Sequence, residues 1–319
     1  MKLDLTNLKI IDELQYNAKI PDSALAKKLN ISREVLAYRI KKLEETEIIK
    51  GYTTIINTAK LGYIMFRIFI KMKNMSKQHE EELIHLLKNK VIWLVRARGN
   101  WSYNLIFQVK KMSEINEFIK DLQNKFSQNI INMQTAILTK IIHSSIQYTD
   151  EKKNNSEKTI ILNMEDQEKI DIDTLDREII SELTQNARIP NTKIAIKLNQ
   201  NERVIRYRIK KLEEQKIILG YRTTLNNKKL EKNYYKIHLT LTNKSTKTIN
   251  DIKNYLKIHK NTAYITETIG GWDIELETIS TNQETYKLID DLEEKFPQTL
   301  QDYEILEYEK EYKLQYLSD

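Results

Sequence analysis

The chain has 319 residues, 40% of them hydrophobic and 30% charged, which is enough for about two to four globular domains with cores of ordinary size. It has no cysteine, which excludes disulfides, thiolate metal sites and cysteine nucleophiles and is typical of a reducing cytoplasm. The sequence contains no run of about 18 apolar residues and no apolar segment near its start, so neither a membrane segment nor a signal peptide is expected. The net charge of +7 favours an anionic partner.

The sequence contains an internal repeat. Residues 4–57 recur as residues 173–226 at a constant offset, with roughly half of the positions identical. Both copies contain the run YRIKKLEE, and both place a proline at the same point of an Asn-Ala-basic-Ile-Pro segment. Weaker matches continue further along the chain, for example Gly99 with Gly270. Each half is therefore predicted to be a complete module.

Residues 1–57 and 172–226 are each predicted to form three short helices and a β segment. In the first copy, apolar residues at helical spacing predict a helix that ends before Asn17–Pro21, and a second amphipathic turn follows. The segment Ile48–Ile56 is β-prone around a Gly-Tyr step, and we predict a short hairpin packed against the helices.

The third helix of each copy has the strongest local signal. Ser32 is a good N-cap, and Leu36, Ile40 and Leu43 follow on one buried stripe. In the second copy the predicted cap is Asn201, and the stripe consists of Ile205, Ile209 and Leu212. Three short helices with a tight turn before the third, followed by a β wing, form the winged helix-turn-helix pattern, in which the third helix enters a DNA groove.

The outward side chains of this reading helix are the predicted DNA contacts. Arginine and lysine pair with phosphates or guanine edges, glutamate accepts from cytosine, and tyrosine bonds a phosphate or stacks on sugar. The predicted contacts are Arg33, Glu34, Tyr38, Lys41 and Lys42 in the first copy and Glu202, Arg203, Arg206, Tyr207, Lys210 and Lys211 in the second. For Glu44 and Glu45 a solvated helix end is favoured. Arg39 and Arg208 lie beside the buried stripe, where a salt bridge is as good an interpretation as a phosphate contact.

Residues 58–142 and 227–319 are each predicted to form a βαββαβ domain. This order predicts an antiparallel sheet with both helices on one face, the ferredoxin-like plan, so the chain as a whole is α+β. The first strands alternate in polarity and are predicted to be half-buried, with Arg67 and His238 on the opposite side from the apolar residues. The bare face of each sheet carries aromatic residues as well as charges, and we predict that it pairs with a second sheet.

Charge and linker composition add two expectations. Residues 58–142 carry about +8 and residues 227–319 about −4, so opposite potentials favour pairing of these two domains, within one chain or between two. The linker, residues 143–171, is polar and acidic but contains Ile160, Ile161 and Leu162. This run is short enough to be a docking strand.

The two-domain unit resembles the Lrp/AsnC family of transcription regulators, in tandem over nearly the whole chain. The residues that carry the resemblance are the NARIP turn, the RIKKLEE run followed by Ile-Ile, and the GYTT or GYRTT strand that leads into the βαββαβ domain. The resemblance implies a sequence-specific regulator without a cofactor and not an enzyme, located in the cytoplasm, with double-stranded DNA as partner and no membrane. It also implies association through the βαββαβ domains, as an intramolecular pseudo-dimer or a homo-oligomer.

The resemblance further implies a small effector, such as an amino acid, near the hairpin that follows the second strand of each βαββαβ domain. A Gly-x-x-Asp pattern is usual there; Ser102 departs from it and Asp273 keeps it. A turn anchored by a core aromatic is the alternative interpretation of both hairpins. The matching positions are Gly99, Asn100, Trp101, Ser102 and Tyr103 in the first half and Gly270, Gly271, Trp272 and Asp273 in the second.

Two other functions stay open. Some proteins that resemble this chain in tandem layout are siroheme decarboxylases, which need basic residues, including histidine, around a pocket for a polycarboxylate. No two of the five histidines occupy matched positions in the repeat, and the sequence shows no catalytic constellation, no metal-ligand spacing and no phosphate-binding glycine loop. The other alternative is an architectural DNA-binding protein without site preference, whose affinity falls steeply with salt.

Overall fold

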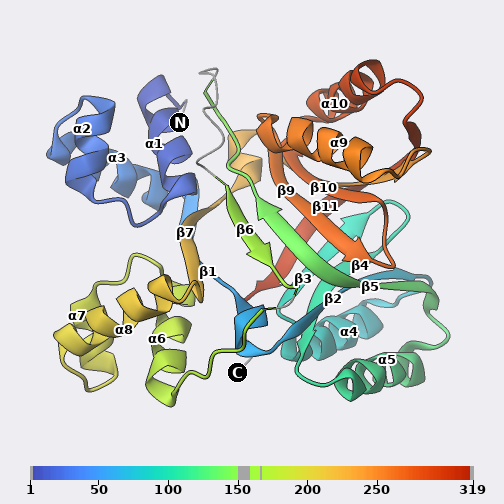
Figure 1. Cartoon of the computed structure of the whole chain (residues 1–319), viewed down its shortest axis with the longest axis horizontal. Helices are drawn as coiled ribbons and strands as arrows, with labels where there is room; N and C mark the ends of the chain where they lie inside the picture. Colours follow the sequence, from blue (N-terminus) through green and yellow to red (C-terminus); the bar gives the residue numbers. More distant parts are fainter. Residues whose placement is uncertain (1–2, 150–158, 166, 317–319) are drawn as a thin grey trace.

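The computed structural model describes residues 3–149, 159–165 and 167–316 (Figure 1). Within the predicted linker, residues 150–158 and 166 lie outside the described residues. None of the helices in the described ranges combines the length and the apolar character that a bilayer crossing requires.

Each copy of the repeat begins with a three-helix domain. The caps are as predicted: Ser32 Oγ accepts a hydrogen bond from the backbone N–H of Val35, and the Asn201 side chain accepts one from the N–H of Arg203. The predicted stripes of both third helices are buried. The helices are α1 (Leu5–Tyr16), α2 (Asp22–Leu29) and α3 (Arg33–Glu45), then α6 (Thr174–Gln185), α7 (Asn191–Lys197) and α8 (Glu202–Glu214).

The β segments of the two copies pair with each other. Strand β1 (Ile49–Ile56) runs antiparallel to β7 (Ile218–Leu225), and together they form a two-stranded ribbon. The predicted hairpin within each copy is therefore wrong. The chain does not turn at the Gly-Tyr step, because each strand finds its partner in the other copy.

Each strand of the ribbon also contacts the three-helix domain of the other copy. The hydroxyl of Thr54 on β1 donates to the carbonyl of Leu183 on α6 (2.7 Å), and Thr223 on β7 donates to Leu14 on α1 (2.9 Å). Each strand thus lies against the first helix of the other copy. The buried apolar side chains of both three-helix domains and the ribbon form one continuous cluster, so the two domains are fixed relative to each other.

Two βαββαβ units complete the chain, in the predicted order. Both sheets have the ferredoxin-like strand order, β5-β2-β4-β3 in the first unit and β11-β8-β10-β9 in the second. A short helical turn precedes each unit: η1 (Thr58–Leu61) and η2 (Asn227–Leu230). The first unit comprises β2 (Ile64–Met72), α4 (Lys77–Lys90), β3 (Trp93–Arg98), β4 (Tyr103–Val109), α5 (Met112–Phe126) and β5 (Ile130–His143). The second comprises β8 (Asn233–Leu241), α9 (Thr246–Ile258), β9 (Thr262–Ile269), β10 (Ile274–Ser280), α10 (Asn282–Lys295) and β11 (Leu300–Leu314).

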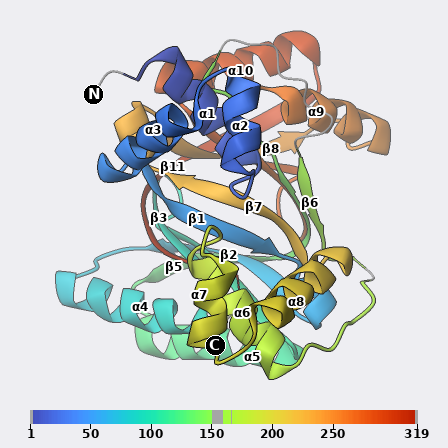
Figure 2. The same ribbon diagram turned by 90° about the vertical axis from the view of Figure 1, so that its left-hand side faces the viewer.

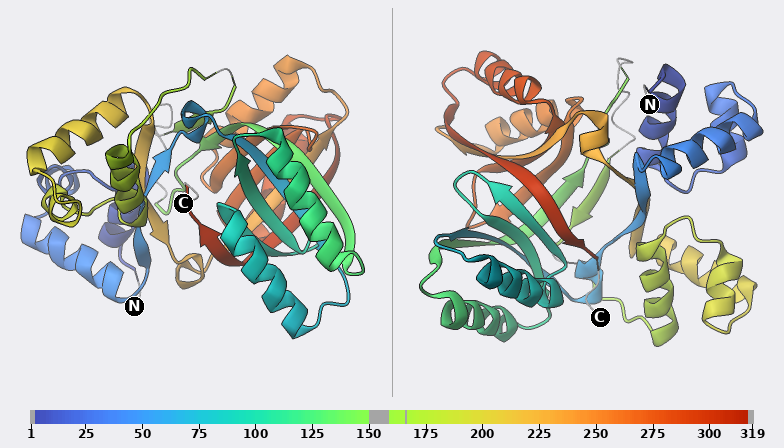
Figure 3. Two further views of the ribbon diagram at one scale, coloured as in Figure 1. Left: turned by 90° about the horizontal axis from the view of Figure 1, so that it is seen from below. Right: turned by 180° about the vertical axis from the view of Figure 1, so that it is seen from behind.

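The two sheets join at their edges. Strand β11 of the second unit pairs with β3 of the first, and β5 of the first pairs with β9 of the second. Among the described strands, eight therefore close into one ring, the closed sheet, with the four helices outside it (Figure 3). The faces of the two sheets that carry no helices do face each other as predicted, but they do so inside one closed sheet and not between two separate sheets. The predicted docking strand is confirmed as β6 (Ile160–Asn163), which pairs with β5.

Closure changes the environment of the first strand in each unit. Arg67 is 2% exposed, and Phe69, Lys236 and His238 are fully buried. The prediction of half-buried strands is wrong here, because the side opposite the helices faces the interior of the closed sheet instead of water.

Candidate nucleic-acid interface

The predicted contact residues lie on the outer surface of α3 and α8. Tyr38 is 63% exposed and Tyr207 65%, although large aromatic side chains are usually covered in a monomer. The side chains of Lys41 and Lys210 are each 74% exposed. Arg33, Glu34, Arg203, Arg206 and Lys211 are also exposed, and Lys42 and Glu202 are half-exposed.

Several of these cations make pairs along their own helix. Lys42 lies 2.8 Å from Glu45, Arg206 lies 2.5 Å from Glu202, and Lys210 lies 3.5 Å from Glu214. Exposed pairs of this kind are worth about 0–1 kcal/mol. A phosphate or a base edge can therefore replace the carboxylate at little cost, and the cations are available to a nucleic acid.

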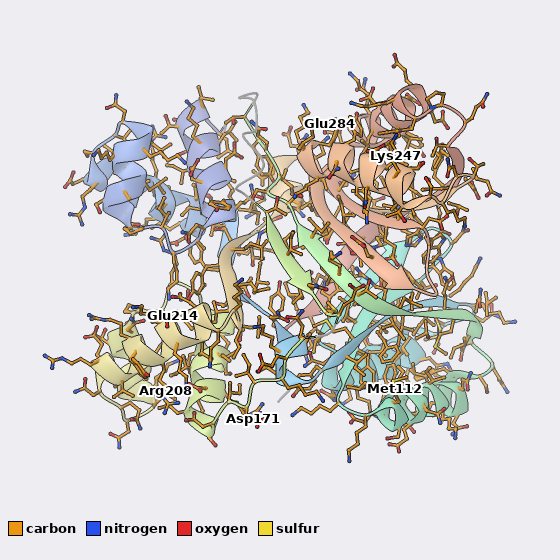
Figure 4. All side chains as sticks on the ribbon, in the orientation of Figure 1. Met112, Asp171, Arg208, Glu214, Lys247 and Glu284 are labelled. Carbon is orange, nitrogen blue, oxygen red and sulfur yellow. The ribbon has the colours of Figure 1, made fainter. Side chains whose placement is uncertain are left out.

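Arg39 and Arg208 have structural partners instead. Arg39 Nη1 lies 2.7 Å from Asp4, and Arg208 Nη1 lies 2.6 Å from Asp173. The backbone N–H of Asn7 and the Arg39 guanidinium together lower the pKa of Asp4. Both arginines tie the reading helix to the start of the first helix of its domain, so the salt-bridge interpretation holds. Figure 4 labels Arg208 and Glu214 on the second domain.

The C-terminal end of each reading helix is attached to the ribbon. The hydroxyl of Tyr52 on β1 donates to Glu44 (2.6 Å), and Tyr221 on β7 donates to Glu213. Glu44 and Glu45 are both exposed, as expected for a solvated helix end, and Glu44 in addition holds the helix against the ribbon. Burial first, and then Glu44, raise the pKa of Tyr52, so its hydroxyl stays protonated as a donor.

Both reading helices lie on the same side of the molecule. Figure 1 shows the two three-helix domains together on one side, with the ribbon between them and the closed sheet. Figure 2 looks directly at that side and shows α3 and α8 on opposite sides of the ribbon. One polypeptide therefore presents two exposed, basic reading helices in a fixed arrangement.

The two Gly-x-Trp hairpins lie at one end of the closed sheet, where they line a cavity together with Lys71 and Asn132. Gly99 and Gly270 have φ values of 131° and 87°, which suit glycine. Trp101 is buried among aromatic rings, 5.7 Å from Phe69 and 6.2 Å from Trp272. The interpretation as turns anchored by core aromatics is thus supported. A cavity of about 710 Å³, the hairpin cavity, is lined by Gly99, Asn100, Trp101, Trp272, Tyr303 and Glu304, among others.

Ser102 and Asp273 have equivalent hydrogen bonds. Ser102 Oγ accepts from the backbone N–H of Met72 (3.0 Å), and the Asp273 carboxylate accepts from the N–H of Leu241 (2.8 Å). Met72 and Leu241 are the last residues of β2 and β8. The departure at Ser102 therefore preserves a structural hydrogen bond, while Asp273 also pairs with Lys244 (3.0 Å).

Sequence reasoning missed a buried charge network inside the closed sheet, formed by Arg67, Lys236, Glu275 and Glu277. Lys236 Nζ lies 2.7 Å from Glu275 and 3.2 Å from Glu277, and Arg67 Nη2 lies 2.9 Å from Glu277. Burial by itself raises the pKa of Glu275, but Lys236 and Arg67 outweigh it and lower this pKa to about 2. The network is thus two cations against two carboxylates. Arg67 and Lys236 occupy matched positions in the repeat, which was the one signal that the sequence offered.

Sequence reasoning also gave no sign of a further cavity, distinct from the hairpin cavity. It has a volume of about 610 Å³ and lies between the ribbon and the end of the closed sheet opposite the hairpins. We name it the ribbon cavity. Its lining includes Thr53 and Arg222 from the ribbon and Arg67, Trp93, His143 and Tyr264 from the closed sheet. Within the described part of the chain, no group of histidine and acidic side chains is arranged to hold a metal ion.

Comparison with known proteins gives three findings. The winged helix-turn-helix DNA-binding family matches the chain twice, over residues 3–50 and 172–218. An uncharacterized HTH-type transcriptional regulator of Pyrococcus abyssi is 30% identical over 118 residues, which cover 37% of this chain and 80% of that protein. The HTH-type transcriptional regulator LrpB of Bacillus subtilis is 26% identical over 123 residues, 38% of this chain and 82% of that protein.

Solved structures of one protein are similar to this chain over almost its whole length. One of them is the siroheme decarboxylase NirDL in complex with an iron-uroporphyrin III analogue, with a TM-score of 0.60 and 17% identity. The similarity covers 97% of this chain and 93% of the decarboxylase. At this identity the match concerns the fold: two helix-turn-helix domains and two ferredoxin-like domains in one polypeptide.

Proposed function

Since the chain belongs to the Lrp/AsnC family of transcription regulators, in a form with two copies of the family's unit, we propose that one polypeptide is a complete sequence-specific DNA-binding module. Its partner is double-stranded DNA, which it meets in the cytoplasm. No cofactor or catalytic step enters this proposal. The observation that carries it is the pair of exposed basic helices, α3 and α8, held on one side of the molecule by the ribbon.

On the reading helices, different residue types suit different kinds of DNA contact. Lys41 and Lys210 extend into solvent near the C-terminal ends of their helices and suit phosphate contacts, which position the protein without reading sequence. Near the N-terminal end of α8, Arg203 and Arg206 suit the acceptor edge of guanine, and Glu34 on α3 suits the amino group of cytosine. The two helices therefore favour different base sequences.

A single chain is free of the symmetry that a homodimer imposes. Two identical subunits present identical helices and read a palindrome. Here the base-contacting positions differ: Glu34 and Ala37 of α3 correspond to Arg203 and Arg206 of α8. We propose an operator with two unlike half-sites and an intramolecular pseudo-dimer in place of a homodimer. A small effector such as an amino acid is proposed to bind in the hairpin cavity.

An electrophoretic titration against genomic DNA fragments, with and without free amino acids, tests the proposal. We expect a few fragments to shift at low protein concentration in the presence of excess nonspecific DNA, and Arg206→Ala to weaken that binding. Lys120→Ala is the matched control, because Lys120 is an exposed cation on α5, on the closed-sheet side of the molecule. Equal shifting of all fragments would instead favour the architectural function.

A second candidate is a siroheme decarboxylase-like enzyme, because the fold similarity to NirDL extends over both halves of the chain. The exposed basic surfaces of α3 and α8 favour the regulator over this candidate. Incubation with siroheme, followed by chromatography of the tetrapyrrole, distinguishes the two: a regulator returns siroheme unchanged, whereas an enzyme converts it to a product with fewer carboxylates.

A further inference from the structure

The ribbon cavity has the size of a ligand site and lies apart from the hairpin cavity. Its volume of about 610 Å³ falls in the range of small-molecule pockets, about 300–1,000 Å³. On β2, Met65 and Arg67 line the ribbon cavity while Lys71 lines the hairpin cavity, so the two cavities lie toward opposite ends of the closed sheet. The buried ring of Phe69 lies between these positions along the strand.

Arg222 gives one wall of the cavity a positive charge that no carboxylate of the described residues neutralises. Its Nε donates to the carbonyl of Gln15 (3.3 Å) and its Nη2 to that of Ser144 (2.8 Å), and Nη1 lies 3.5 Å from His143 Nδ1. A guanidinium has five N–H groups, so about two remain for another acceptor. No carboxylate among the described residues lies within 4.0 Å of it. A half-buried cation of this kind favours an anion.

His143 adds a second unsatisfied donor. Its side chain is 4% exposed, and burial together with Arg222 lowers its pKa well below the ordinary value, so the ring is neutral. Arg222 can only donate, and Nδ1 therefore acts as the acceptor and Nε2 carries the proton. Nε2 has no hydrogen-bond partner among the described residues. A buried donor without a partner is unfavourable, and an acceptor atom of a ligand removes that cost.

Three of the four carboxylates that line the cavity are already engaged. Glu277 is held by Arg67 and Lys236 in the buried charge network, Glu309 pairs with arginines of β3, and Glu311 accepts a hydrogen bond from Trp93 Nε1 (2.9 Å). The fourth, Glu307, has no ion pair among the described residues. The remaining wall near Arg222 is aromatic and apolar: the Tyr264 ring lies 5.7 Å from the Arg222 guanidinium and 4.9 Å from the His143 ring, and Leu162 is buried beside them.

We infer that the ribbon cavity binds one small organic anion per chain, whose acidic group pairs with Arg222 and His143 and whose aromatic or apolar body lies against Tyr264. The internal repeat supports a single site. Arg222 pairs across the ribbon with Thr53, its equivalent in the first copy, so only one of the two matched positions carries the cation.

The position of the site gives it a regulatory role, and this step rests on the proposed function. A ligand in the cavity contacts the ribbon on one side and the closed sheet on the other. The ribbon and both three-helix domains share one core, so ligand binding biases how this unit is held against the closed sheet. Only a ligand that prefers one such arrangement can shift the equilibrium.

A fluorescence titration with anilinonaphthalene sulfonate, an aromatic anion of the inferred class, tests the site without DNA. We expect saturable binding of one probe per chain and an increase in dissociation constant of at least about tenfold for Arg222→Thr, since a hydrogen bond to a charged group contributes about 1.5–3 kcal/mol. Threonine is the residue of the first copy at this position, so the substitution suits the ribbon. Arg222→Lys keeps the charge and should bind with intermediate affinity.

Arg206→Thr is the matched control, because it makes the same substitution on the exposed surface of α8. It should bind the probe as the original chain does and should bind DNA more weakly. Arg222→Thr should bind the probe more weakly and should bind DNA as the original chain does. Thermal unfolding of each variant checks that it is folded. The inference is overturned if the probe does not saturate or if a folded Arg222→Thr binds it with unchanged affinity. Because the titration contains no DNA, such a failure leaves the proposed function untouched.

Discussion

Thr53 on β1 and Arg222 on β7 lie directly opposite each other in the ribbon and occupy the same position in the two copies of the repeat. The neighbouring pairs are mirrored about them, since Tyr52 faces Thr223 and Thr54 faces Tyr221. The pseudo-twofold axis of the chain therefore passes between Thr53 and Arg222. The backbones of the two copies are related by this axis, but their side chains differ both here and on the reading helices.

The salt dependence of DNA binding tests the two reading helices together. If both engage phosphates, the plot of log K against log[salt] should have a slope several units negative, and Lys41→Ala or Lys210→Ala should each flatten it by about one unit. Lys120→Ala should leave the slope unchanged. Lysine variants that bind with the original slope would remove these helices from the interface.

The buried charge network predicts a large loss of stability when one cation is removed. Lys236→Met leaves Glu275 and Glu277 with Arg67 alone, and the expected loss in the free energy of unfolding is about 3–5 kcal/mol, measured by urea denaturation. The double variant Lys236→Met/Glu275→Gln should lose less than the single one, because the unpaired charge is gone. Exposed Lys210→Met is the control. A single variant within about 1 kcal/mol of the original chain would contradict the account.

The pKa of His143 predicts how stability depends on pH. Burial first, and then Arg222, hold this pKa well below its ordinary value of 6.5. Below that pH, His143 therefore takes up a proton in the unfolded chain but not in the folded chain. The His143 contribution is complete above 6.5 and is lost as the pH falls, by at most about 1.4 kcal/mol per pH unit.

His238 contributes with the same sign, because burial lowers its pKa more than Glu304 raises it. Urea unfolding between about pH 7.5 and about pH 5 measures the combined slope. His143→Gln should reduce that slope and leave the part due to His238. An unchanged slope in the variant would show that His143 titrates normally in the folded chain.

The reading helices were predictable from the sequence, and the interior of the closed sheet was not. Ser32 and the stripe that begins at Leu36 are local signals, since a cap and a period of 3.6 residues specify a helix and its buried face. Strand β2 shows the limit of such reasoning. Alternation placed Arg67 opposite the apolar residues, but alternation cannot distinguish a face in water from a face against other charged side chains.

The ribbon and the ribbon cavity depend on contacts between residues far apart in the chain. Gly51 and Tyr52 favour a turn locally, but the pairing of β1 with β7 satisfies the backbone of both strands and overrides that preference. The unlike residues at Thr53 and Arg222 were visible in the repeat. Their meaning appears only when both lie on one cavity wall.

The structural role of Asp273 predicts a matched pair of substitutions. Asp273→Ala removes the acceptor for the N–H of Leu241 and should cost about 1–2 kcal/mol in the free energy of unfolding, whereas Asp273→Ser should cost less because Ser102 makes the equivalent bond in the first copy. Urea denaturation of both variants measures the difference. Equal losses would mean that Asp273 stabilises the hairpin in another way, such as through Lys244.

In vitro selection of binding sites from random duplex DNA tests the central claim most directly. For the monomeric chain we predict two unlike half-sites about one or two helical turns apart, one of them rich in guanine, and we predict that Arg206→Ala changes that half-site and leaves the other intact. Recovery of a perfect palindrome, or of no enriched sequence at all, would contradict the proposal that one polypeptide reads DNA through two different helices.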